Sequence, residues 1–302
     1  MTSSAPPPDL NANPTDLDIS CPLCEYNLRG LSEPRCPECG YKFVWAQLID
    51  ATRSAHPYLF EVQRRKVWSF WKTLVGGLRP VRFWKKLKPA HRGNLRRLFL
   101  YWLITGLIGL AAAFALDRVV ESLLPALLTR YTTNTYTYGL APRPLLFYSS
   151  TPDSVDFEIG FYSLHFQVRE VAVIYAGTIL IWPTLTLLAL LIFQQSMARA
   201  KIRTHHLFRC VIYSADVVIW GSFFCMAVLA AYAALVLGGG QGFSMLEVYL
   251  YTCTGIVTLF CIRLGVALHF YLQMDHPFWT VLTTQVLVAL AIVTAFVAAS
   301  VA

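Results

Sequence analysis

Five long apolar stretches dominate the second two-thirds of the chain. They cover residues 98–116, 171–193, 210–237, 246–272 and 279–301, and the second contains Pro183, which predicts a kink. An α-helix needs about 20 apolar residues to cross the hydrocarbon core of a bilayer, and each stretch is close to that length. The pattern predicts an all-α polytopic membrane protein whose five transmembrane helices lie within residues 98–302.

A second pattern, basic and aromatic, lies directly before these stretches, in residues 53–97. Phe60, Val67, Trp71, Leu74 and Leu78 recur at helical spacing, and Arg65, Lys66, Ser69, Lys72 and Thr73 fall on the other side. A shorter piece between Pro80 and Pro89 sets Phe83, Trp84 and Leu87 against Arg82, Lys85, Lys86 and Lys88. Since proline does not continue a helix from its interior, the two prolines indicate a bounded element.

Charge and composition sharpen this picture. Residues 53–97 hold thirteen Lys or Arg and one acid, Glu61, so the segment carries +12 in a chain whose net charge is +8. The chain is 56% hydrophobic and 14% charged, whereas soluble domains carry about 25% charged residues. Residues 1–20 are rich in Pro, Ser, Asn and Asp and lack the apolar core of a secretory signal, so we expect a disordered tail.

The basic amphipathic segment 53–97 has three interpretations. Helices of this kind, with Trp and Phe on the apolar side, lie in membrane interfaces, where anionic lipid on the cytoplasmic side attracts Lys and Arg. The same charges would suit the phosphates of a nucleic acid. The third interpretation is a solvated basic face packed on its own protein. The nearby apolar stretches favour the interface, with the lipid bilayer as partner.

Four cysteines form two Cys-x-x-Cys pairs in residues 21–43. The pairs are Cys21 with Cys24 and Cys36 with Cys39, and the sequence reads CPLCEYNLRGLSEPRCPECGYKF. Two such pairs can place four thiolates around one tetrahedral Zn²⁺. So short a module has too little core to fold alone, so one structural zinc would supply its stability. The pattern predicts a zinc ribbon; a rubredoxin-like iron site or two redox pairs are the alternatives.

The motif CxxCxYxLRGL followed by RCPECG resembles the N-terminal zinc ribbon of a family of uncharacterised bacterial multi-span membrane proteins. In that family the ribbon precedes a basic, proline-bounded aromatic segment, like the one that His56-Pro57 and Leu78-Arg79-Pro80 to Phe83-Trp84 form here. The architecture also resembles the Yip-domain membrane family, which is tied to vesicle trafficking in eukaryotes. The first resemblance implies a bacterial inner (cytoplasmic) membrane protein.

Loop charges predict the orientation of the spans. The segment before the first span is strongly basic, and the loop between the second and third contains Arg199, Lys201, Arg203 and Arg209. The loop between the third and fourth, GGGQGFS, has no basic residue, and the long outer loop 117–170 mixes both signs. The positive-inside rule then places the N-terminus in the cytoplasm and the C-terminus outside. In that reducing compartment cysteines persist as thiols and metal ligands.

In the outer loop, the segments YTTNTYTYG and DFEIGFYSLHFQV predict a short β-hairpin.

Two ionisable residues lie inside the predicted spans, Asp216 in the third and Arg263 in the fourth. Charges are costly in lipid, so we expect an intramembrane Asp216–Arg263 pair. Such a pair either fixes helix register or serves as a gate or ion site; Arg263 can alternatively snorkel to the interface.

A second metal site is conceivable near the ends of the spans, although the spacing of its ligands does not support it. The residues concerned are His205, His206, His269, Asp275 and His276. Small residues Ala291, Ala295 and Ala299, and Ala227 with Ala231, predict close helix packing within the chain or in a homodimer.

No catalytic motif is present among the spans or the cysteine module. A four-cysteine site leaves no open coordination position for chemistry. We therefore expect a non-catalytic integral membrane protein, an adaptor or scaffold that engages a protein partner through its zinc ribbon. The alternatives are a small transporter or channel that uses Asp216 and Arg263, and a membrane enzyme.

Overall fold

The computed structural model describes residues 19–53, 56–63, 66–91, 93–112, 114–115, 118, 148–151, 154–159, 162–196, 202–237 and 245–301. The chain divides into two compact units. The first contains Met1–Tyr101, Thr184–Ser214 and Cys261–Ala302, and the second contains Trp102–Pro183 and Ala215–Phe260. Of the predicted tail, residues 1–18 lie outside the described part of the chain.

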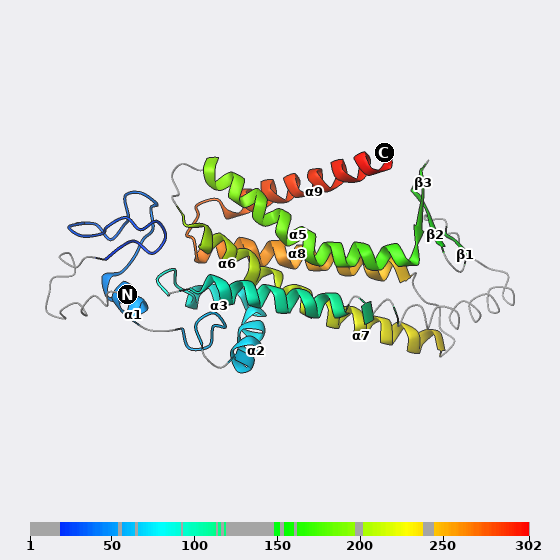
Figure 1. The fold of residues 1–302 in the computed structure, drawn as a ribbon, viewed down its shortest axis with the longest axis horizontal. Helices are drawn as coiled ribbons and strands as arrows, with labels where there is room; N and C mark the ends of the chain where they lie inside the picture. The colour runs from blue at the N-terminus through cyan, green and yellow to red at the C-terminus, as the bar shows by residue number, and fades with distance from the viewer. Residues whose placement is uncertain are drawn as a thin grey trace. The chain divides into compact units, whose positions relative to one another are not determined.

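Four helices in the described residues are long and apolar enough to cross a membrane: Leu95–Ala112, Thr204–Val228, Tyr251–Phe270 and Pro277–Ala295. The last two belong to α8 (Met245–Phe270) and α9 (Pro277–Val301). The second predicted stretch forms α5 (Val168–Ser196), in which the apolar segment Ile179–Phe193 is shorter. The protein is therefore predominantly helical, with four of the five predicted spans meeting the length and hydropathy of a membrane helix (Figure 1).

The third predicted stretch begins earlier than expected and is broken. It starts at Thr204 rather than at Cys210, and it consists of α6 (Thr204–Ala215) and α7 (Val217–Leu237) with a turn at Asp216. Aspartate is a favoured residue directly before a helix, because its carboxylate can accept from the free N–H groups of the first turn. Arg209, which the loop-charge argument counted as a loop residue, lies inside α6 and is fully buried.

Three short helices precede the spans: α1 (Trp45–Arg53), α2 (Lys66–Gly77) and α3 (Pro80–Lys86). As expected, Pro80 begins α3. Proline lacks a backbone N–H, and this costs nothing in the first turn of a helix, where that N–H would have no partner within the helix. Phe83, Trp84 and Leu87 are buried, while Arg82, Lys85 and Lys86 are exposed. Trp84 packs on Tyr213 and Tyr271, with ring centroids 6.4 and 5.5 Å away. The aromatic side of α3 therefore faces the protein, not a surrounding lipid or solvent phase.

The two sides of α2 differ from the sequence prediction. Ser69 and Thr73, expected on the basic side, are fully buried, whereas Val67 and Trp71 are exposed. Thr73 explains the difference, because its hydroxyl donates to the carbonyl of Tyr58 at 3.2 Å and accepts from the N–H of Phe60 at 3.0 Å. A small hydroxyl side chain can thus satisfy backbone groups of the preceding loop at a place where a long cation cannot fit.

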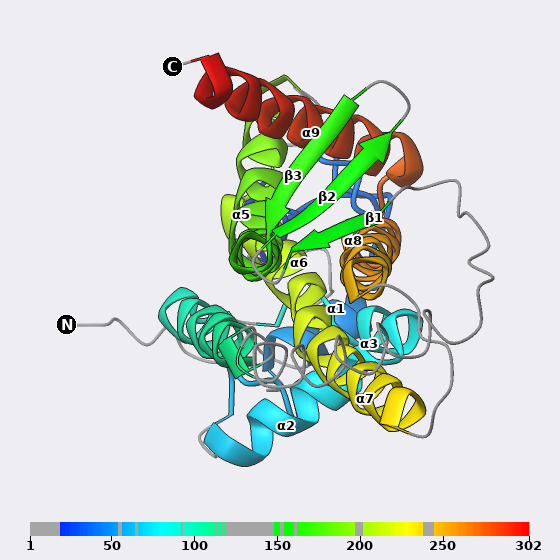
Figure 2. The same cartoon turned by 90° about the vertical axis from the view of Figure 1, so that its right-hand side faces the viewer.

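The second unit contains a three-stranded antiparallel sheet in the order β1-β2-β3, which the all-α expectation did not include. The strands are β1 (Tyr148–Thr151), β2 (Ser154–Ile159) and β3 (Tyr162–Gln167), seen side by side in Figure 2. Strands β2 and β3 pair from Ser154↔Gln167 to Ile159↔Tyr162, so the hairpin predicted for DFEIGFYSLHFQV is present. The other predicted hairpin strand, YTTNTYTYG, lies outside the described residues.

Candidate metal centre

The cysteine module is built from two copies of one turn, fifteen residues apart. In the first copy, Cys21 N–H donates to Tyr26 O at 2.7 Å and Glu25 N–H donates to Cys21 O at 2.9 Å. In the second, Cys36 N–H donates to Tyr41 O and Gly40 N–H donates to Cys36 O, both at 2.9 Å. The bridges Ser20↔Asn27 and Arg35↔Lys42 close the two copies in the same way. The repeat is visible in the sequence as CPLCEY and CPECGY.

The residue after each second cysteine has a left-handed backbone. Glu25 has φ 67° and Gly40 has φ 71°. Glycine adopts this conformation without strain, whereas a residue with a side chain does so rarely. Glu25 is held there by an ion pair with Arg203 from the start of α6. The second turn thus adopts this conformation without strain, whereas the first turn adopts it at Glu25, whose side chain pairs with Arg203.

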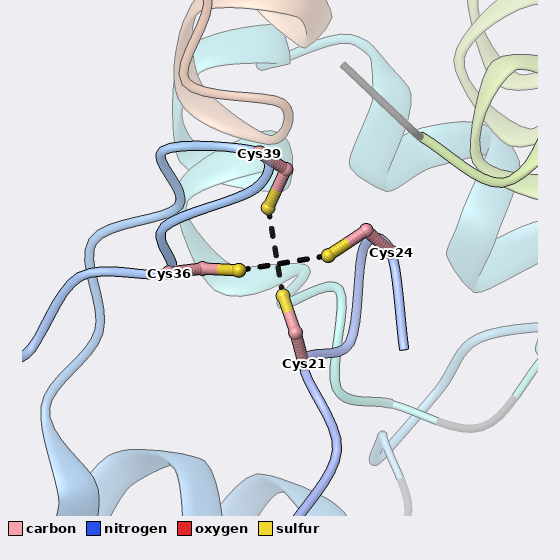
Figure 3. A group of neighbouring side chains, drawn as sticks. All are labelled: Cys21, Cys24, Cys36 and Cys39. Carbon is pink, nitrogen blue, oxygen red and sulfur yellow. Dashed lines mark hydrogen bonds between the residues drawn. The ribbon is translucent and has the colours of Figure 1, made fainter. Parts of the chain in front are cut away.

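The two turns bring all four thiols together (Figure 3). The Sγ atoms of Cys21 and Cys39 are 3.5 Å apart, as are those of Cys24 and Cys36, and all four lie within 4.8 Å of one another. Cys21 and Cys36 are buried, and Cys24 and Cys39 are partly exposed. The dashed lines of Figure 3 cross near one point, so four sulfur ligands surround a common centre. Such a donor set fits one tetrahedral metal ion.

The thiols in the cluster share their protons. The hydrogen bond from Cys21 lowers the pKa of Cys39 to about 5, and the same hydrogen bond raises the pKa of Cys21. One thiolate is thus already favoured at pH 7. Only thiolates ligate a metal, and a divalent cation would replace the remaining protons. The cluster can therefore hold a metal ion.

The module is anchored to the ends of the long apolar helices within the first unit. Arg203, just before α6, donates its N–H to Leu23 O at 2.9 Å. Gln273, in the loop between α8 and α9, accepts from Lys42 N–H at 3.0 Å and donates to Lys42 O at 3.2 Å. Leu23 lies between the first two cysteines, and Lys42 closes the second turn. Each turn is therefore bound to a different interhelical loop.

A directed chain of hydrogen bonds continues from the first turn into the buried interior. His206 in α6 lies 2.7 Å from Pro22 O through Nε2 and 2.7 Å from the Tyr271 hydroxyl through Nδ1. A carbonyl only accepts, so Nε2 carries the proton and Nδ1 accepts from Tyr271. The Tyr271 oxygen in turn accepts from Arg209 Nη1 at 2.6 Å. Arg209, Tyr271 and His206 thus donate in one direction, toward Pro22.

Behind this chain lies a buried ion pair between Arg209 and Glu61. Arg209 Nε is 2.7 Å from Glu61 Oε1, and both side chains are 1% exposed. Burial raises the pKa of Glu61, and the neighbouring Arg209 charge acts against that rise. Glu61 is the only acid in residues 53–97. A single acid among thirteen cations is the feature of the sequence that could have indicated a specific partner. Nothing in the sequence identified Arg209 as that partner, because the two are 148 positions apart.

The backbone around the ion pair is fitted to it. A Cβ added at Gly93 would lie 2.2 Å from Arg209 Nη2 and 2.9 Å from Glu61 Oε2, so only glycine leaves room for the guanidinium. Arg209 Nη2 also donates to His91 O at 3.3 Å. Burial lowers the pKa of His56 to about 4 and also lowers the pKa of His91, and their rings lie 5.3 Å apart. Both histidines are therefore neutral at pH 7, and Arg209 is not opposed by nearby imidazolium charges.

The predicted Asp216–Arg263 pair remains a prediction. Arg263 in α8 is buried, and its Nη2 donates to Tyr213 O at 2.6 Å. The turn at Asp216 ends α6, which frees the last carbonyls of that helix, and arginine is a common partner for such groups. Asp216 belongs to the second unit and is also buried. Asp216 lies at the break between α6 and α7, and Arg263 reaches a carbonyl beside that break from within α8.

The second metal site considered for the histidines near α6 and α8 does not form within the described part of the chain. Among the residues that the structure describes, the only group of His, Cys, Asp and Glu side chains close enough to hold a metal ion is that of the four cysteines. His206 contacts Pro22 and Tyr271 through its two ring nitrogens, so neither nitrogen is available to a metal. The unsupported spacing in the sequence agrees with this result, because nearness of histidines in sequence says nothing of where their nitrogens point.

Comparisons with known proteins give no relative: no family model matches the chain, and no curated protein and no solved structure matches it. The structure shows clustered cysteines together with several apolar helices, which is compatible with a metal-binding motif attached to a membrane protein. The resemblances to a ribbon-containing bacterial family and to the Yip-domain family remain predictions from sequence.

Proposed function

We propose that the chain is a non-catalytic integral membrane protein, an adaptor or scaffold that holds a structural zinc ribbon on the cytosolic face of a bacterial inner membrane. The observation that carries this proposal is the anchoring of both cysteine turns to interhelical loops, through Arg203, His206 and Gln273. A rigidly mounted, closed metal module suits recognition of a protein partner. It does not suit chemistry, because four cysteine ligands leave no coordination position for a substrate.

Zinc is the metal that this donor set and compartment favour. Zn²⁺ prefers tetrahedral thiolate ligands, and the cytosol keeps cysteines reduced. Cys21 and Cys36 are buried, and their turns repeat the same backbone pairing, as in a ribbon built from two equivalent halves. Four thiolates on one Zn²⁺ carry a formal charge of −2, and Arg35 contributes a cation whose guanidine nitrogens approach Gly40.

A topology of five spans with the N-terminus inside is supported by the contacts of the N-terminal module. The module contacts the loop before α6 and the loop after α8, as expected if both loops lie on its own side of the membrane. Helix α5 has 29 residues, about 43 Å at 1.5 Å per residue, which is enough to span the hydrocarbon core.

This topology predicts the location of two reporters. Fusions after Gly240 and after Ala302 should both report an external location, because an odd number of spans separates each from the cytoplasmic N-terminus. As a control, each position is fused separately to a reporter that is active only in the cytoplasm and to one that is active only in the periplasm. A cytoplasmic signal after Ala302 would mean an even number of spans and would contradict the charge argument.

The alternative function is a small transporter or channel, which the buried charges Asp216 and Arg263 favour. Single substitutions Asp216→Asn and Arg263→Gln and their combination separate the two functions. For an adaptor, we expect each single change to lower thermal stability and the double change to restore part of it. A folded single variant that has lost a solute or ion flux present in proteoliposomes of the wild-type protein would instead establish transport. The predicted homodimer can be tested on the same preparations by their molecular mass.

A further inference from the structure

Helix α2 presents an apolar, aromatic face that the protein leaves uncovered. Val67, Trp68, Trp71, Val75 and Leu78 are all exposed, and Val67 is exposed by 74%. The opposite face is buried through Ser69, Phe70, Thr73 and Leu74. The buried face is thus the narrower and more polar one. A helix that turns its Trp and Val residues away from its own protein requires another apolar phase to cover them.

The surroundings of this face are basic. Residues 66–88 contain seven Lys or Arg and no acid. Lys72, Arg79, Arg82, Lys85 and Lys86 are exposed, and Lys72 Nζ lies 5.9 Å above the ring of Trp68. Helix α3 contributes mainly charge beside one exposed apolar side chain, Val81, because its aromatic side chains are buried against Tyr213 and Tyr271. The exposed surface of the two helices therefore combines apolar side chains from α2 with cations from both.

The contacts of α2 place it beside the start of the first membrane helix. Phe70 packs on Tyr101, with ring centroids 5.2 Å apart, and Arg97 Nη1 donates to Gln63 O at 2.9 Å. Tyr101 is six residues after Leu95, where that helix begins, which corresponds to about 9 Å along its axis. In the membrane topology proposed above, this position puts the exposed face of α2 at the level of the headgroups and upper acyl chains.

We propose that α2 is an interfacial helix whose Val67, Trp68, Trp71, Val75 and Leu78 insert between lipids, while Lys72, Arg79 and Arg82 bind the anionic headgroups of the cytoplasmic leaflet. This inference rests on the membrane topology proposed above and identifies a binding surface within it. The occupant is the lipid of the same membrane, because the face is attached to the first turns of a spanning helix. Aliphatic Val67, Val75 and Leu78 match acyl chains and have no complement on a nucleic-acid backbone.

Hydrogen exchange of the full-length protein in nanodiscs tests the proposal. The probes are nanodiscs of phosphatidylcholine alone and of phosphatidylcholine mixed with phosphatidylglycerol. We expect amides of α2 to exchange at least about fivefold more slowly in the anionic nanodiscs, which is the effect of one Lys or Arg at such a surface. Lys72→Gln with Arg82→Gln should abolish most of this difference. As a control, Arg29→Gln with Lys42→Gln removes the same charge from the exposed surface of the cysteine module. This double variant should keep the difference in α2 exchange between the two nanodiscs.

A second measurement tests the apolar half. Lipids brominated in the upper acyl chain should quench a smaller share of the tryptophan emission in Trp68→Phe with Trp71→Phe than in wild-type protein. Equal quenching in the two proteins, or equal exchange of α2 in both nanodiscs, overturns the proposal. Slowing of α2 exchange by added RNA or duplex DNA but not by anionic lipid also overturns it and assigns the surface to nucleic acid. Rapid exchange throughout α8 and α9 in the same data would instead refute the membrane topology itself.

Discussion

Arg209→Met is expected to lower the free energy of unfolding by about 3–5 kcal/mol, the typical cost of removing one partner of a buried ion pair. The substitution keeps an unbranched apolar side chain in place of the aliphatic part of arginine but leaves Glu61 buried without its cation. It also removes the donors to the Tyr271 hydroxyl and to His91 O. Thermal unfolding in nanodiscs, with Arg96→Met as an exposed control for the loss of one charge, measures the effect.

The loss of stability in Arg209→Met should depend on pH in a definite direction. Burial raises the pKa of Glu61 and Arg209 is the largest influence that opposes the rise, so the pKa should be higher in the variant, where only hydrogen bonds from Tyr213 and the Asn94 backbone still oppose it. A carboxyl whose pKa is higher in the folded state than in the unfolded state destabilises the fold above that pKa and ceases to do so as it protonates. The deficit of Arg209→Met should therefore shrink as the pH falls from 8 to 5. The double variant Glu61→Leu with Arg209→Met should lose less than the sum of the two single losses; additive losses would mean that the pair is not coupled.

Cys36→Ser is expected to abolish metal binding and to unfold the cysteine module locally. Metal binding to such sites contributes an apparent ~10–16 kcal/mol, which is far more than so small a module can gain from its core. Metal analysis should give one zinc per wild-type chain and none in the variant. Cys261→Ser makes the same chemical change outside the cluster and should leave the metal content unchanged. The spans should stay inserted, because lipid and helix packing stabilise them.

Three outcomes of the metal experiment are informative. Zinc in the wild type and loss of a crosslinked protein partner in Cys36→Ser would support an adaptor that acts through the ribbon. Iron with a visible absorption band would identify a rubredoxin-like site and favour electron transfer. Wild-type protein without metal, in which the four thiols alkylate freely, would show that the ribbon interpretation is wrong.

The sequence predicted the parts of the protein whose signal is local. The four cysteines were assigned from spacing alone, because a Cys-x-x-Cys turn needs only its own backbone to position both sulfurs. Four apolar helices followed from length and hydropathy, and α3 followed from its prolines. The sides of α2 were misjudged at Ser69 and Thr73, because helical periodicity reports two faces but not which one the protein covers.

The buried network could not be predicted, because it joins residues that are distant in the sequence. Arg209 looked like a loop cation at the edge of an apolar stretch, and His206 was one of several histidines with no assigned partner. Both roles depend on partners, Glu61 and Pro22, that lie well over a hundred positions away. Hydropathy and charge counts treat each residue alone, so a cation that is neutralised by a distant acid is indistinguishable from a free one.

The anchoring of the cysteine module also has a consequence for biogenesis. Lys42 and its partner Gln273 are 231 residues apart, so the ribosome completes the second cysteine turn long before it makes the loop that holds it. At roughly 5–20 residues per second the delay is about 10–50 s. For most of that time, until Arg203 and His206 have been made, the module has no docking site and only metal can keep it folded. Metal supply during translation therefore determines whether a folded module is available when the last helices enter the membrane.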